Sequence, residues 1–123
     1  MKKRSIFLIL IIFSLLTVGC KYDFILPEEV PPIDNGGDPI RFSSQIAPIF
    51  AEKCISCHKP GSTSPDLTAT NAYTQIVPKY INATTPASSK IYTYPTSGTH
   101  YAKVTATQAA LILKWIQEGT KNN

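Results

Sequence analysis

The chain has 123 residues, which is enough for one domain and no more. Its 12 lysine and arginine residues stand against 8 aspartate and glutamate residues. Three of the bases lie in the N-terminal segment discussed next, so the rest of the chain is nearly balanced, and a nucleic-acid-binding protein would need a denser basic face.

The N-terminal segment has the pattern of an export signal. Residues 2–4 are basic, and Ile6 to Leu16 is an almost unbroken apolar run. This run is too short to span a bilayer comfortably. It therefore predicts a cleaved signal over residues 1–19, with small residues just before Cys20 at the cleavage site.

Residues 20–40 form the next segment, which is rich in proline and glycine and carries five acids against one base. Proline removes backbone donors and a Gly-Gly pair breaks periodicity, so a semi-extended acidic tether is predicted. The alternative is an irregular arm that packs on the domain through Phe24 to Leu26.

The remaining residues, 41–123, are predicted to form the folded domain. Ser43 or Ser44 is expected to cap a helix that runs into Cys54, because apolar residues recur three and four positions apart along it. These inward-facing residues are Ile46, Ile49 and Phe50.

Further helices are predicted downstream. Thr70 to Val77 fits a short helix, Pro86 to Tyr94 one turn at most, and Pro95 to His100 a loop. The clearest helix begins with a capping box at Thr105–Gln108 and stops at Gly119. Because no stretch alternates as a strand does, the fold class is predicted to be all-α with long loops. The buried face of the last helix is expected to include Ala109, Ile112, Trp115 and Ile116.

The sequence Cys54-Ile55-Ser56-Cys57-His58 matches the attachment signal for c-type haem. Each of the two thiols would form a thioether to one haem vinyl group, and His58 would be the proximal iron ligand. A domain this small with so much loop would be only marginally stable by itself. A single covalent haem would supply part of its core, and the long loops are expected to wrap around it.

Three readings without haem compete with this interpretation. A zinc site would use Cys54, Cys57 and His58, but His100 is the only remaining histidine or domain cysteine that could be the fourth ligand. A thioredoxin-like dithiol would follow a strand in a βαβ pattern, which is not present here. A structural disulfide across a two-residue spacer would be strained and easily reduced.

Over Phe42 to Gly119 the chain resembles class I monohaem c-type cytochromes, particularly small bacterial lipoprotein versions. Ile46 to Phe50 looks like part of the first helix of that family, and Leu113 to Gly119 looks like its last helix. The resemblance implies a small cytochrome c-like domain whose function is electron transfer.

The segment Pro65-Asp66-Leu67 is similar to the Pro-x-Leu segment of that family. By this resemblance, the carbonyl of Pro65 would accept a hydrogen bond from His58, and Leu67 would pack on the haem. The alternative reading is an ordinary turn.

The distal ligand departs from the family pattern, which places a methionine shortly before the last helix. Met1 is the only methionine and belongs to the signal, so His/Met ligation is excluded. His100 occupies the corresponding stretch and is predicted as the distal ligand. An open or water-ligated iron, or ligation by Lys90, Lys103 or another group, remains as the alternative.

Cys20 and the residues before it resemble the lipobox of bacterial lipoproteins, although Thr17 stands where leucine is usual. The resemblance implies that Cys20 is acylated and anchors an exported protein to a bacterial membrane, facing the periplasm or the cell exterior. The alternative is a secreted protein with an unpaired thiol at Cys20.

The expected function is electron transfer rather than catalysis, because no paired carboxylates, activated nucleophile or phosphate-binding loop accompanies the haem motif. A haem-based sensor or binding module with an open distal site is the alternative, and an interaction domain with structural zinc is a third. From Arg41 onward there are eight bases against three acids, so we expect redox partner proteins with an acidic docking face and no nucleic acid.

Overall fold

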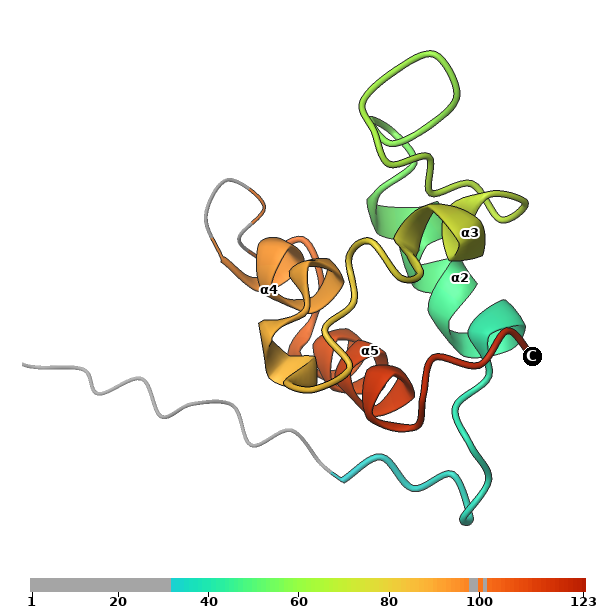
Figure 1. The fold of residues 1–123 in the computed structure, drawn as a ribbon, viewed down its shortest axis with the longest axis vertical. Coiled ribbons are helices and arrows are strands. Elements are labelled where there is room, and N and C mark those ends of the chain that lie inside the picture. Colours follow the sequence, from blue (N-terminus) through green and yellow to red (C-terminus); the bar gives the residue numbers. More distant parts are fainter. Residues whose placement is uncertain (1–31, 98–99, 101) are drawn as a thin grey trace, which may run out of the picture.

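The computed structural model describes residues 32–97, 100 and 102–123, and all regular secondary structure within these ranges is helical. The predicted helical fold class is therefore confirmed for this part of the chain. In Figure 1, α4 and α5 form one group of helices and α2 and α3 form the other. None of the helices in the described ranges is long and apolar enough to cross a membrane. The predicted signal and Cys20 lie outside the described residues.

The first helical segment runs without interruption into the Cys54–His58 motif. It starts with a π-helical turn, η1 (Phe42–Ile46), and continues as α2 (Ala47–Lys53). The predicted apolar stripe is buried, because Ile46, Ile49 and Phe50 are at most 5% exposed. This burial fixes the direction in which α2 leads the chain to Cys54.

The predicted serine cap of this helix is wrong. The backbone N–H of Arg41 donates to Gln45 Oε1 at 2.8 Å, and that of Phe42 donates to Asn123 Oδ1 at 2.9 Å. The N–H of Ser43 donates to the backbone oxygen of Asn123 at 2.9 Å. Gln45 and the distant residue Asn123 thus satisfy donors that a helix start leaves without intrahelical partners, and a serine cap is not needed.

The middle of the chain contains more helix than predicted. Helix α3 (Ala72–Ile76) lies within the predicted segment, and its two end residues are fully buried. A 3₁₀ turn, η2 (Pro86–Ser88), and α4 (Lys90–Thr96) follow where only one helical turn was expected.

Pro95 was predicted to lie in a loop, but it is inside α4. Proline removes one helical donor, and here it does so in the last turn. Thr96 Oγ1 donates to the carbonyl oxygen of Tyr92 or Thr93, at 3.1 and 3.0 Å, and Ser97 Oγ lies 2.7 Å from the Thr93 oxygen. These hydroxyl groups add side-chain hydrogen bonds to the last turn, next to the proline.

The last helix, α5 (Ala106–Gln117), begins with the predicted capping box: Thr105 Oγ1 accepts from the N–H of Gln108, and Gln108 Oε1 accepts from that of Thr105. Gly119 ends it with a φ of +91°, a conformation that favours glycine. The four residues predicted for its inner face are buried, namely Ala109, Ile112, Trp115 and Ile116.

An aromatic cluster joins the first helical segment to α3 and α5. The ring centroid of Phe42 lies 5.3 Å from those of Tyr73 and Trp115. Tyr73 Oη donates to the Thr120 carbonyl, and Trp115 Nε1 donates to the Lys121 carbonyl, both at 2.9 Å. Such aromatic pairs stabilise a fold beyond the burial of their area, so this cluster holds the two groups of helices together.

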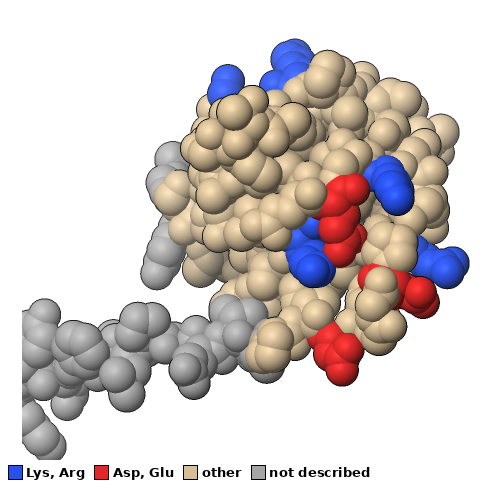
Figure 2. Space-filling view, turned by 60° about the horizontal axis from the view of Figure 1, so that its bottom comes forward, with Lys and Arg blue, Asp and Glu red and all other residues tan. Residues whose placement is uncertain are grey.

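The buried core starts at Ile40, which is 1% exposed, one residue before the predicted domain boundary. Within the described part of the predicted tether, Ile33 packs partly buried against the core. On the face shown in Figure 2, basic and acidic side chains are interspersed, and neither sign forms a continuous patch there.

Candidate functional site

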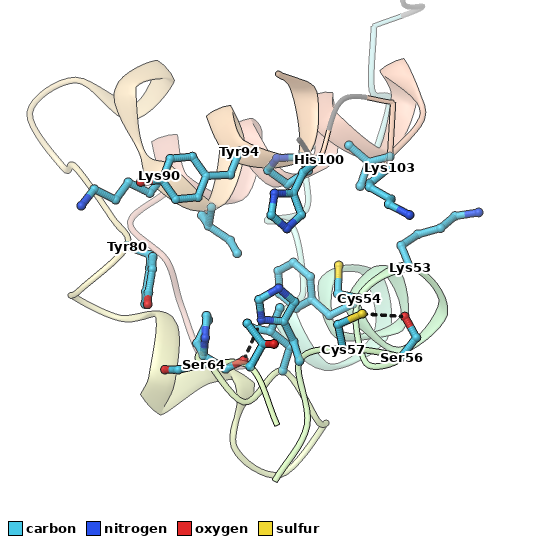
Figure 3. Close-up of a pocket in the computed structure, with 18 residues that line it drawn as sticks. Lys53, Cys54, Ser56, Cys57, Ser64, Tyr80, Lys90, Tyr94, His100 and Lys103 are labelled. Carbon is cyan, nitrogen blue, oxygen red and sulfur yellow. Dashed lines mark hydrogen bonds between the residues drawn. The ribbon is translucent and has the colours of Figure 1, made fainter. Parts of the chain in front are cut away.

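A pocket of about 490 Å³ lies beside the cysteine motif. Figure 3 shows His100, Lys90 and Tyr94 on one wall and Cys54, Cys57 and Ser64 on the opposite wall. The volume lies within the range of about 300 to 1,000 Å³ that is typical of cofactor and small-molecule pockets. Apolar side chains line much of it, including Phe50, Leu67, Ile91, Pro95 and Val104.

The cysteine motif forms a single turn at the end of α2. The carbonyl oxygen of Cys54 accepts hydrogen bonds from the N–H groups of Cys57, at 3.2 Å, and His58, at 2.9 Å. Cys54 and Cys57 are free thiols, and both line the pocket. Partial burial raises the pKa of the Cys54 thiol above its ordinary value, while the charge of Lys103 acts in the opposite direction. Two unpaired thiols on one turn are what covalent attachment to one cofactor requires.

His58 is held by both its backbone and its side chain. Its carbonyl oxygen accepts from the N–H of Leu67 at 2.9 Å, and its Nδ1 lies 3.1 Å from the carbonyl oxygen of Pro65. Because a carbonyl oxygen only accepts, Nδ1 carries the proton in this contact, and Nε2 keeps the lone pair that binds a metal. Pro65 and Leu67 are both buried, and the contact between His58 and Pro65 is partly buried.

His100 lies across the pocket from the motif, with its ring directed into the pocket (Figure 3). The ring centroids of His58 and His100 are 6.0 Å apart, and the ring planes are inclined by 39°. A bond from an imidazole nitrogen to a metal such as zinc is about 2 Å long, and that nitrogen lies about 1 Å from the centre of its ring. Two imidazoles that bind one metal ion between them would therefore have about this centroid separation. The separation of His58 and His100 thus suits two imidazoles that would bind one metal ion between them.

The zinc alternative has no comparable geometric support among the described residues. In residues 32–97, 100 and 102–123, no group of three or more histidine, cysteine, aspartate or glutamate side chains is placed to hold a metal ion. Cys54, Cys57 and His58 are thus not gathered around one point in this structure, whereas the two imidazoles face one another.

The structure brings most of the predicted site residues into one pocket. These are Cys54, Cys57, His58, Pro65, Leu67 and His100. The alternative distal ligands Lys90 and Lys103 also line it, so the pocket contains every ligand candidate that the sequence named individually. Cys20 lies outside the described residues.

The sequence did not lead us to expect that α4 forms part of the pocket wall. Lys90 and Tyr94, and likewise Ile91 and Pro95, are four positions apart, and all four line the pocket. This spacing marks one helix face, but the segment was taken for one turn followed by a loop. Phe50 was expected to be first of all a core residue, and it both belongs to the core and lines the pocket.

The chemistry that the pocket can support follows from its donors and its shape. It offers two thiols on one turn, an imidazole fixed by a backbone carbonyl, a second imidazole opposite, and an apolar interior. No protein-family model, curated protein sequence or solved structure matches this chain.

Proposed function

We propose that the pocket binds one covalent haem c and that the protein is an electron-transferring c-type cytochrome. The observation that carries this proposal is the pair of imidazoles 6.0 Å apart, one of which belongs to the Cys54–His58 motif. Motif and geometry are independent, because nothing in the motif requires a distant histidine to face it.

Each residue then has a defined part in holding the group. Cys54 and Cys57 would form the two thioethers, and His58 and His100 would be the axial ligands. The Pro65 carbonyl orients the His58 ring through Nδ1. A bound haem would supply the one-electron couple of its iron.

Buried apolar side chains form part of the pocket lining. Phe50 is 1% exposed and Leu67 is 4% exposed, and both line the cavity. Exclusion of solvent from a haem is one of the factors that set its reduction potential.

Two facing imidazoles favour an electron carrier over an enzyme or a gas sensor. With both axial positions occupied, an exogenous ligand would first have to displace a histidine. The carrier proposal therefore predicts slow or absent binding of carbon monoxide at neutral pH.

The cellular setting is proposed from the sequence. Acylation of Cys20 would anchor the exported protein to a bacterial membrane, with residues 21–40 as the link to the domain. The domain itself carries more bases than acids, which favours transient docking to acidic redox proteins.

The absorption spectrum of purified protein tests this proposal. We expect c-type bands after reduction, haem that stays with the polypeptide after denaturation and acid-acetone extraction, and a low-spin oxidised form. Absence of bound haem after expression with a c-type maturation system would refute the haem proposal. Covalent haem with rapid carbon monoxide binding would instead favour a sensor.

A further inference from the structure

The two ends of the pocket carry different polar side chains. Figure 3 shows Lys53 and Lys103 at the end occupied by Cys54 and Cys57, and Lys90, Tyr80 and Tyr94 toward the other end. All of these side chains line the same cavity.

Backbone contacts bring Tyr80 and Lys90 together. The carbonyl oxygen of Tyr80 accepts a hydrogen bond from the N–H of Ile91 at 3.3 Å, so the start of α4 is joined to Tyr80. Lys79 adds a second cation, since its Nζ lies 5.5 Å from the Tyr80 ring centroid. Tyr80, Lys90 and Tyr94, which line the pocket, together with Lys79 beside Tyr80 are called the tyrosine end.

Lys90 has no carboxylate partner within the described part of the chain. The ion pairs found there are Lys53 with Glu52 at 2.6 Å and Lys114 with Glu118 at 3.6 Å. The remaining acid of the helical domain, Asp66, is engaged by Thr68 and Asn71. A cation and two tyrosine hydroxyl groups at a pocket end are suited to an anion.

The chemistry of haem decides where its anions lie. Its two vinyl groups are on one half of the porphyrin ring, and its two propionates are on the opposite half. Thioethers to Cys54 and Cys57 would fix the vinyl half at the cysteine end, so the propionates would point to the tyrosine end.

We propose that Lys90 forms the main electrostatic contact to the haem propionates, with the hydroxyl groups of Tyr80 and Tyr94 as additional donors. This inference rests on the proposed haem site and adds the orientation of the cofactor within it. Lys53 and Lys103 are the competing cations, but they lie at the cysteine end, and Lys53 is already paired with Glu52.

The pH dependence of the reduction potential tests the inference. An ammonium group beside a propionate lowers the pKa of that propionate, because it stabilises the charged form. The titratable groups at this end are Lys79, Lys90, Tyr80 and Tyr94, so among the described residues it contains no histidine and no carboxyl group. A change in potential between about pH 5 and 8 therefore reports the propionates when the axial histidines are ligated.

The variants are Lys90→Met, Lys53→Met and Lys103→Met, measured as haem-containing protein. Each removes one positive charge from the pocket lining, so the last two are matched controls. In Lys90→Met we expect the midpoint of the pH-dependent change in potential to rise by about one pH unit. We expect Lys90→Arg to restore it and the two controls to stay near the unsubstituted protein.

The possible outcomes separate the two proposals. If the unsubstituted protein contains no covalent haem, the proposed function and this inference fail together. If haem is attached but Lys90→Met matches the two controls, only the propionate assignment is wrong. A shift in Lys103→Met or Lys53→Met that exceeds the shift in Lys90→Met would place the propionates at the cysteine end and overturn the proposed orientation.

Discussion

The rings of His58 and His100 face each other with their centroids 6.0 Å apart, although one residue follows α2 and the other precedes α5. Helix packing brings the two segments together: Phe42 at the start of the first helical segment contacts Trp115 in α5 at 5.3 Å between ring centroids. The candidate axial pair thus depends on the contact between the first and last helical segments.

Replacement of His100 tests its part in ligation. We expect His100→Ala to convert the oxidised iron from low to high spin and to allow rapid carbon monoxide binding. His100→Met should raise the reduction potential by more than about 59 mV, a tenfold change in the equilibrium, because thioether ligation raises haem potentials. Lys103→Ala is the control and should keep the low-spin spectrum. An unchanged spectrum and potential in His100→Ala would show that His100 does not bind iron.

Replacement of both Cys54 and Cys57 with alanine should abolish covalent haem. The variant would lose the haem proposed to occupy the pocket of about 490 Å³, so its melting temperature should fall sharply relative to the unsubstituted protein. Mass spectrometry and thermal unfolding measure the two effects. Ser56→Ala, which keeps both thiols, should retain haem. A double variant that melts as high as the original would show that haem contributes little to stability.

The predicted acylation of Cys20 is tested by Cys20→Ser. The variant should lack acyl chains and leave the membrane fraction, because each buried methylene of an acyl chain contributes about 0.8 kcal/mol to membrane binding. Intact mass and fractionation after a high-salt wash give the result. Retention of the serine variant in washed membranes would contradict a lipid anchor at this position.

The contact between Asn123 and the first helical segment should stabilise the domain. Asn123→Ala removes the oxygen that accepts from the Phe42 N–H, and the free energy of unfolding should fall by about 1 kcal/mol, as for a lost helix cap. Denaturant titration measures the change. Asn122→Ala alters a neighbouring exposed amide and should have little effect. Equal stability of the two variants would show that the contact is unimportant.

Asp66 should make stability depend on pH. Hydrogen bonds from the Asn71 side chain and from the Thr68 backbone and hydroxyl lower the pKa of its carboxyl group. A carboxyl with a lowered folded-state pKa contributes stability above its unfolded-state pKa of about 3.9, and that contribution is lost as pH falls through the folded-state value. Asp66→Asn should therefore melt lower than the original protein at pH 7, with the difference shrinking below about pH 4. A difference that stays constant from pH 7 to pH 2 would contradict this explanation.

The sequence predicted those features that depend on local signals. The capping box at Thr105, the stop at Gly119 and the buried stripes of the first and last helices follow from short-range spacing, and all are present. The sequence also indicated which residues would line the site, because the cysteine motif has a specific spacing and His100 was the one histidine left.

Features that depend on distant contacts could not be predicted. No local pattern reveals that Asn123 accepts hydrogen bonds from the start of η1, or that Tyr80 meets α4 through Ile91. Pro95 was misleading because proline usually interrupts a helix, yet here it lies in the last turn of α4, next to side-chain hydrogen bonds from Thr96 and Ser97.

The attachment of residue 40 to the end of α5 has a mechanical consequence. The N–H of Ile40 donates to Glu118 Oε2 at 2.6 Å, and Phe42 is held by Asn123 immediately afterwards. A pulling force applied along residues 32–39 would therefore load these two hydrogen bonds and the end of α5 before it reached Cys54. These contacts at the start of the first helical segment would therefore bear the force first. The pocket would keep its geometry until the two hydrogen bonds broke.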